Sequence, residues 1–182
     1  RPLPHRADPV KIARTSAMHK VQAVAAVTHG IIVAADTVVA DGLNLLGKPQ
    51  TEAEAERYLK SLRGREHTVV TALTLINGGD SPYLSHCVSK VMMRNYTDRE
   101  IAEYILSGRP FDKAGAYGIQ DTPFLPVESV KGCYLNVVGL PACTLLHMLA
   151  KRGICMRMNL RREMGKSCRA CYSRLVTDEL QG

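Results

Sequence analysis

The chain has 182 residues, of which 46% are apolar and 23% charged, and it carries a net charge of +7. This length fits one domain with a proper core. No apolar run approaches the roughly 18 residues that a membrane-spanning helix needs, and no signal-peptide pattern opens the sequence. Six cysteines without a secretory signal indicate reduced thiols. We therefore expect a cytoplasmic protein without a membrane partner.

The first predicted elements are a helix and an apolar strand. Residues 9–27 predict a helix, because apolar residues recur on one face at steps of three or four. Residues 31–35 form a continuous apolar run that is typical of a strand buried on both faces. The run meets Asp36 and Thr37 and then continues through residues 38–40. This part of the sequence predicts a buried strand with a carboxylate in its middle.

Two Thr-x-x-Glu capping boxes, which begin at Thr51 and Thr97, predict the next two helices. The first helix ends near Gly64, and its core stripe is Ala55, Tyr58, Leu59 and Leu62. Strand-like segments at 67–77 and 83–94, joined by a turn-rich stretch, lie between the two boxes. A loop at 112–120 and a final helix that ends near Lys151 complete this part. Interleaved helices and strands predict the α/β class with a mixed sheet.

The C-terminal end holds most of the positive charge. From Lys151 onward eight basic and three acidic residues give +5, which leaves +2 for the first 150 residues. Such a tail is compatible with salt-sensitive, sequence-independent nucleic-acid binding. Its only aromatic residue is Tyr172, so a stacking platform for bases is lacking and nucleic acid is not an expected partner. Cys168 and Cys171 have C-x-x-C spacing, but a zinc site needs two more ligands.

Asp36 is the first candidate for chemistry, because an unpaired buried charge would destabilise an apolar strand. Such a carboxylate is tolerated when it coordinates a cation, accepts hydrogen bonds or points into a cleft. The alternative is that Asp36 caps a helix or bonds to a loop. Lys20 and Lys48 are candidate phosphate partners, although lysines in a helix and a loop are by default solvated. No Walker A, G-x-G-x-x-G or H-E-x-x-H motif occurs.

Four short strings together resemble the Maf family of nucleoside triphosphate pyrophosphatases, in the same order and with the same spacing. They are Ala35-Asp36-Thr37, Gly47-Lys48-Pro49, the segment 112–120 (DKAGAYGIQ) and the segment 136–141 (NVVGLP). The likeness runs from Arg1 to Gly153. It implies an elongated mixed sheet flanked by helices, with a central cleft (Maf/ITPase-like), over residues 1–153. Residues 154–182 would form a basic tail with no counterpart in the family, and their weak periodicity predicts that they are disordered or only partly helical.

The resemblance also implies roles for individual residues. Asp36 matches the family's proton acceptor, which would activate water beside a bound divalent cation, Mg²⁺ or Mn²⁺, that Asp36 helps to hold. Lys20 and Lys48 match the lysines that hold the triphosphate. Thr37 and Gln120 match the positions that set base preference, and here they are similar to the branch that acts on dTTP and UTP. The family often forms homodimers, so the resemblance implies one here.

The sequence departs from the family pattern in several places. The family usually has glycine where Ala116, Asp121 and Ala72 stand, and these changes would narrow or stiffen the cleft. The family also opens with a strand and a Ser-x-x-Arg phosphate loop upstream of the segment that resembles residues 1–4. We therefore expect an N-terminally incomplete domain that is a poor catalyst in this form. An inactive relative with an interaction role, and a nucleic-acid binder that uses the basic tail, are the alternatives.

Overall fold

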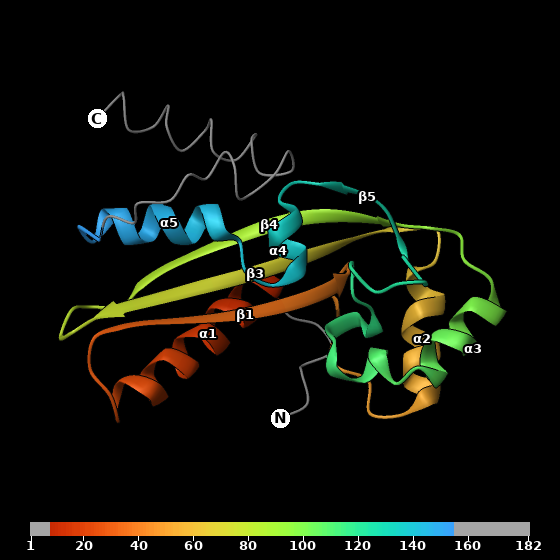
Figure 1. Ribbon diagram of the computed structural model, residues 1–182, viewed down its shortest axis with the longest axis horizontal. Coiled ribbons are helices and arrows are strands. Elements are labelled where there is room, and N and C mark those ends of the chain that lie inside the picture. Colours follow the sequence, from red (N-terminus) through yellow and green to blue (C-terminus); the bar gives the residue numbers. More distant parts are fainter. Residues whose placement is uncertain (1–7, 155–182) are drawn as a thin grey trace.

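The computed structural model describes residues 8–154, which form a twisted sheet flanked by helices (Figure 1). The predicted α/β class is confirmed. In chain order the elements are α1 (Pro9–Ala25), β1 (Ile31–Asp41), β2 (Asn44–Leu46), α2 (Glu52–Leu62), β3 (Glu66–Asn77), β4 (Tyr83–Met93), α3 (Asp98–Leu106), η1 (Arg109–Asp112), η2 (Ala114–Ala116), β5 (Val127–Lys131), α4 (Tyr134–Val138) and α5 (Ala142–Lys151). Within this range no helix is long and apolar enough to cross a membrane. The tail assigned to 154–182, with Cys168 and Cys171, lies almost entirely outside the described residues.

The sheet has the order β2-β1-β3-β4-β5, and each neighbouring pair in it is antiparallel. The prediction of a mixed sheet is therefore wrong for the described residues. The helix α2 does connect two strands that run the same way, β2 and β3, but β1 lies between them and is antiparallel to both. Interleaving of helices and strands thus did not bring parallel strands side by side. The long β3–β4 hairpin adds another antiparallel pair.

The two ends of β1 lie in different surroundings. β2 pairs with β1 only from Val39 to Asp41, so residues 31–38 have no strand on their outer side within the range 8–154. Ile31 is 52% exposed and Val33 is 39% exposed, whereas Val39 is buried. The prediction of a strand buried on both faces is wrong for residues 31–35, of which only Ile32 is buried; the buried part of the strand is residues 38–40. The open half of β1 is the edge at which Asp36 and Thr37 lie.

Alternation along β1 sends successive side chains to opposite faces of the sheet. Val38 and Ala40 pack against α1, together with Val70 and Ala72 of β3. Ala35, on the opposite face, packs with the cluster that α5 forms over β3. Figure 1 shows α1 and α5 on the two sides of the long strands, and α2 and α3 grouped at one end. Asp36 therefore faces α1, while Thr37 faces the side of α4 and α5.

The two predicted capping boxes differ in the structure. At α3 the box is complete, because Thr97 accepts from the Glu100 N–H and Glu100 accepts from the Thr97 N–H. At α2 only half of the box forms. Thr51 accepts from the Glu54 N–H, but the Glu54 carboxylate accepts from the N–H of Gln50, one residue earlier. A capping box can be recognised from the motif, but which donor the glutamate takes depends on the approach of the preceding chain.

We predict that Glu100 makes the stability of the fold depend on pH. The backbone N–H of Thr97, followed by the Arg94 guanidinium and the Thr97 hydroxyl, lowers the pKa of Glu100 to about 2. A lowered folded-state pKa gives stability that is present above about pH 4.5 and lost as the pH falls toward 2. The difference in Tm between wild type and Glu100→Gln should therefore shrink between pH 6 and pH 2.5. A difference that is constant with pH would contradict this role. Glu103→Gln, which removes the exposed ion pair with Arg99, is the control.

Candidate active site

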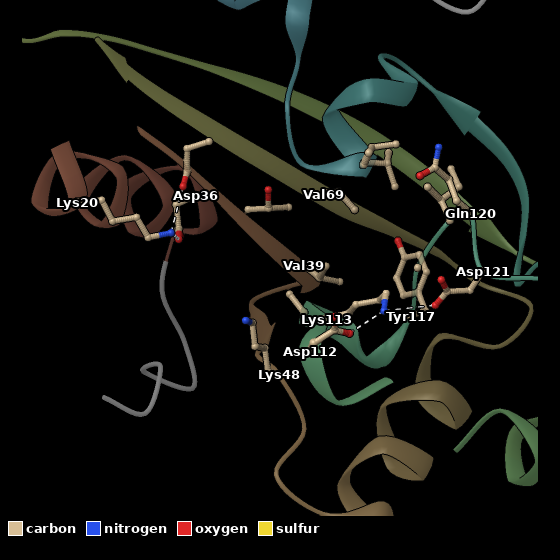
Figure 2. A pocket seen from close by; sticks show the side chains of 17 residues that line it. Lys20, Asp36, Val39, Lys48, Val69, Asp112, Lys113, Tyr117, Gln120 and Asp121 are labelled. Atoms are coloured by element: carbon tan, nitrogen blue, oxygen red, sulfur yellow. Dashed lines mark hydrogen bonds and ion pairs between the residues drawn. The ribbon is translucent and has the colours of Figure 1, made fainter. Parts of the chain in front are cut away.

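A cleft of about 400 Å³ opens beside the free edge of β1. It brings together all five residues that the sequence analysis selected (Figure 2). These residues are Lys20, Asp36, Thr37, Lys48 and Gln120. They come from α1, β1, the loop after β2 and the turn after η2, which are far apart in the sequence. Figure 2 shows Lys20 and Asp36 at one end of the cleft and Gln120 at the other, with Lys48 and Lys113 between them.

The Asp36 end of the cleft is built on an ion pair. Lys20 reaches from α1 to the edge of β1, where its ammonium donates to Asp36 Oδ1 at 2.5 Å and to the Ala35 carbonyl at 3.0 Å. The Asp36 side chain is 20% exposed, and it lies opposite the small Ala72 of β3 in the sheet register. The alternative that Asp36 caps a helix or bonds to a loop is not what the described residues show. Its partner is the neighbouring lysine, in a cleft open to a ligand.

A divalent cation fits this end only if a ligand supplies most of its oxygen atoms. The described part of the chain contains no group of three or more His, Cys, Asp or Glu side chains that could hold a metal. Mg²⁺ is usually held by one or two carboxylates together with water and substrate phosphates, rather than by an all-protein cage. Asp36 Oδ2 accepts no hydrogen bond from residues 8–154, so it can serve as the protein ligand in that arrangement.

Two lysines lie midway along the cleft. Lys48 follows β2 in a loop that is tied to η2, because Gly115 N–H donates to the Gly47 carbonyl at 3.0 Å. Lys113 was not selected from the sequence, although it lies in the segment 112–120. Its ammonium donates to Asp112 Oδ1 at 2.6 Å and to the Arg109 carbonyl at 2.8 Å. The hydrogen bond from Lys113 lowers the pKa of Asp112. Both ammonium groups point toward the same cleft as Asp36.

Thr37 is held by a buried hydrogen-bond network on the other face of the sheet. Its hydroxyl oxygen lies 2.9 Å from that of Thr71, and the Thr71 hydroxyl donates to the Asn136 carbonyl at 2.9 Å. Since Thr71 has one hydroxyl proton and uses it there, Thr37 is the donor between the two threonines. The Thr37 oxygen is therefore left as an acceptor beside the cleft.

The Gln120 end of the cleft is a tight turn. Asp121 N–H donates to the Gly118 carbonyl at 3.2 Å, so Gln120 sits near the tip of a four-residue turn. The Gln120 side chain is exposed and makes no hydrogen bond within residues 8–154. An amide both donates and accepts, so this side chain can pair with the edge of a base.

Below this turn, Tyr117 bonds to a buried histidine. The Tyr117 hydroxyl lies 2.7 Å from His67 Nε2. Burial raises the pKa of Tyr117 and lowers that of His67 to about 4. Both groups are therefore neutral at physiological pH, and this part of the floor adds no charge to the cleft.

Of the three departures from the family pattern, Asp121 lines the cleft, whereas Ala116 and Ala72 are buried beside it in the chain or the sheet. Ala116 adopts φ 63, in the left-handed region that favours glycine, directly after Gly115 at φ 73. Ala72 lies opposite Asp36 in the register of β1 and β3. Asp121 accepts a hydrogen bond from Tyr104 and lies 3.6 Å from the Lys113 ammonium. Of the three, Asp121 alone introduces new polar contacts.

Known proteins resemble this chain over the same region. A family model described as "Maf-like protein" matches residues 1–152. A dTTP/UTP pyrophosphatase of Dehalococcoides mccartyi is 46% identical over 165 residues, which are 90% of this chain and 74% of that protein. The dTTP/UTP pyrophosphatase of Thermomicrobium roseum is 44% identical over 172 residues, 93% of this chain and 78% of that protein. That of Carboxydothermus hydrogenoformans is 47% identical over 148 residues, which are 80% of each chain.

Proposed function

The chain belongs to the Maf family, and on that premise we propose that it hydrolyses dTTP and UTP to the monophosphate and pyrophosphate. The observation that carries the proposal is the single cleft that unites Asp36, three lysines and Gln120. The lysines in the middle and at one end of the cleft suit the charge of a triphosphate. The Gln120 amide at the other end suits a base. The relatives named dTTP/UTP pyrophosphatase support the same reaction.

In this proposal Asp36 is the general base. Release of pyrophosphate requires water to attack the α-phosphorus, the bond from that phosphorus to the bridging oxygen to break, and a proton to leave the water. Asp36 would accept this proton, because it is the one carboxylate that lies at the edge of β1 in the cleft. A divalent cation, Mg²⁺ or Mn²⁺, held by Asp36 and the substrate phosphates, would supply neutralisation of the phosphate charge.

Lys20 has two tasks in this scheme. Before substrate binds, its ammonium neutralises Asp36 at 2.5 Å, which makes the charged carboxylate acceptable at the strand edge. When a triphosphate enters, the same ammonium can turn its three donors to phosphate oxygens, and Oδ1 becomes available to water. Lys48 and Lys113 would hold the rest of the phosphate chain as charge-assisted donors.

Base selection follows from the groups at the other side of the cleft. Uracil and thymine present an N3–H donor beside an O4 acceptor, whereas cytosine presents an acceptor and an amino group at these positions. The Thr37 oxygen is left as an acceptor, and the Gln120 amide can both donate and accept. An acceptor together with an adaptable amide favours the uracil and thymine edge.

We predict that UTP and dTTP have a higher kcat/KM than ATP and GTP. The measurement is pyrophosphate release for each common triphosphate, with Mg²⁺, with Mn²⁺ and with a chelator. Chelation should remove the activity. A purine preference would refute the role of Gln120, and absence of pyrophosphate release with all nucleotides would refute the proposed function.

The homodimer and the domain boundary at residue 153 stay predictions.

A further inference from the structure

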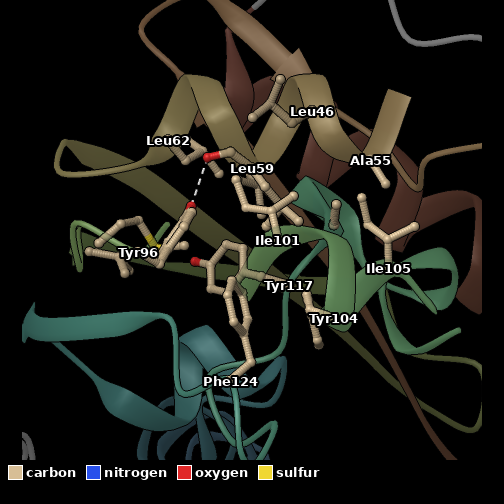
Figure 3. Close-up of a cluster of buried hydrophobic side chains, with 14 of the residues drawn as sticks. Leu46, Ala55, Leu59, Leu62, Tyr96, Ile101, Tyr104, Ile105, Tyr117 and Phe124 are labelled. Carbon is tan, nitrogen blue, oxygen red and sulfur yellow. Dashed lines mark hydrogen bonds between the residues drawn. The ribbon is translucent and has the colours of Figure 1, made fainter. Parts of the chain in front are cut away.

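One buried hydroxyl joins both ends of the turn that carries Gln120. The Tyr104 hydroxyl on α3 donates to Asp121 Oδ2 at 2.5 Å and accepts from the Gly118 N–H at 3.1 Å. The tyrosine is only 4% exposed, and its ring stacks on Phe124 with the centroids 4.2 Å apart (Figure 3). The turn is therefore tied to the buried apolar cluster that includes residues of α2 and α3.

The packing of the turn depends on the same carboxylate. A Cβ atom added at Gly118 would lie 2.7 Å from Asp121 Oδ2, so the carboxylate fills the space that a side chain at position 118 would need. Asp121 Oδ2 also lies 3.6 Å from the Lys113 ammonium, the cation midway along the cleft. Burial, together with the hydrogen bond to Asp121, raises the pKa of Tyr104. The hydroxyl thus stays protonated and keeps donating at neutral pH.

Gln120 has no side-chain partner of its own among residues 8–154, so its position depends on the backbone of the turn. An amide presents a donor and an acceptor that are fixed relative to each other. If the turn moves or rotates, the amide no longer meets both groups of a uracil or thymine edge. Recognition that relies on paired hydrogen bonds is sensitive to such displacement, because unpaired polar groups then remain at the contact.

We propose that Tyr104 and Asp121 are positioning residues for base recognition, which hold the 118–121 turn so that Gln120 selects uracil and thymine. This inference rests on the proposed function, since it requires Gln120 to contact the base. It adds two residues that do not touch the reacting atoms. Asp36 and Lys20 lie at the opposite end of the cleft (Figure 2), so the chemical step should not depend on the pair.

The test compares Tyr104→Phe and Asp121→Ala with wild type and with Tyr58→Phe. The control removes a similar hydroxyl, which donates to Glu54 Oε1 at 2.8 Å on α2, outside the cleft. We measure kcat and KM for UTP, dTTP and CTP, and Tm for each protein. We expect KM for UTP and dTTP to rise about tenfold in both cleft variants, as for the loss of one hydrogen bond to a charged group. We expect kcat to stay within about twofold and the preference for UTP over CTP to fall.

Each other outcome is decisive. An unchanged KM and an unchanged UTP preference in a folded Tyr104→Phe protein would overturn the positioning role. An equal loss for every nucleotide, whether in KM or in kcat, would show that the pair does not act on base selection, and would also overturn it. If Tyr104→Phe does not fold, Asp121→Ala decides in the same way. An inactive wild type overturns the proposed function itself, whereas an active wild type with unaltered selectivity in the variants overturns the positioning role alone.

Discussion

Asp36→Asn is expected to lower kcat for UTP and dTTP by about 10²–10⁴-fold, the typical loss when a general base is removed. The substitution keeps the size and shape of the side chain. It removes the negative charge that would accept the proton from water and hold the divalent cation. Loss of the cation would add to the loss of the base, so the larger end of this range is expected. Near-normal turnover in a folded variant would refute the assignment of Asp36.

The fold should tolerate this change. Asp36 lies at the open edge of β1 with its side chain 20% exposed, and its partner Lys20 is 54% exposed. An exposed ion pair contributes only about 0–1 kcal/mol, so Tm should remain close to that of the wild type. Asp41→Asn is the matched control on the same strand. Asp41 accepts two hydrogen bonds from Arg65, at 3.0 and 3.1 Å, and does not line the cleft. Its loss should leave kcat unaltered.

Much of the candidate site could be predicted because its residues stand out locally. The sequence alone singles out Asp36, because a carboxylate is unusual inside an apolar run. The structure explains why the charge is tolerated at this position. The strand edge is open there, and a lysine from α1 neutralises the charge. Lys20 and Lys48 were candidates by their charge, and the family resemblance then added Thr37 and Gln120 from short strings. All of them line the same cleft.

The residues that hold the site in place could not be predicted. Tyr104 is one residue of the apolar face of α3, and nothing in that pattern indicates a hydrogen bond to Asp121. Lys113 stands in a polar loop, where a lysine is ordinarily solvated. In each case the role of the residue depends on a tertiary contact with another segment, and the residue's own place in the sequence does not indicate that contact. Contacts of this kind follow from the packing of elements and not from periodicity or spacing.

The fold shows the same division between local and distant signals. The helices α1, α2, α3 and α5 and the strands β1, β3 and β4 were predicted, because each is long enough to carry an apolar stripe, a capping motif or an apolar run. The strands β2 and β5 and the helix α4 have three, five and five residues, and elements this short do not stand out from the loops beside them. The direction of strand pairing was predicted wrongly, since it depends on where β1 inserts between β2 and β3 and not on the order of elements.

The second large effect is expected at Asn136, a fully buried residue of α4 whose side chain links this helix to β3 and β4. Its amide nitrogen donates to the Val69 carbonyl at 3.0 Å and to the Ser89 hydroxyl at 2.9 Å, and its amide oxygen accepts from the Thr71 N–H at 3.0 Å. Asn136→Ala leaves these three groups without that partner. Each buried unsatisfied group costs about 1–3 kcal/mol, and partial compensation by water or by repacking would reduce the sum.

We therefore expect Asn136→Ala to lower the free energy of unfolding by about 3–5 kcal/mol and Tm by roughly 10 °C. The same change should raise KM for UTP, because the lost amide oxygen accepts from the Thr71 N–H and so helps to fix Thr71, whose hydroxyl accepts from Thr37 at the cleft. Thermal melting and pyrophosphate-release kinetics on one preparation measure both effects. Asn95→Ala is the control, since Asn95 is exposed and its side chain makes no hydrogen bond within residues 8–154. The Ser89 hydroxyl keeps its bonds with the Cys133 backbone, so the Val69 carbonyl and the Thr71 N–H carry the loss. A Tm within about 2 °C of wild type would be too small a shift for two buried groups that lose a partner, and would show that the network contributes little to stability.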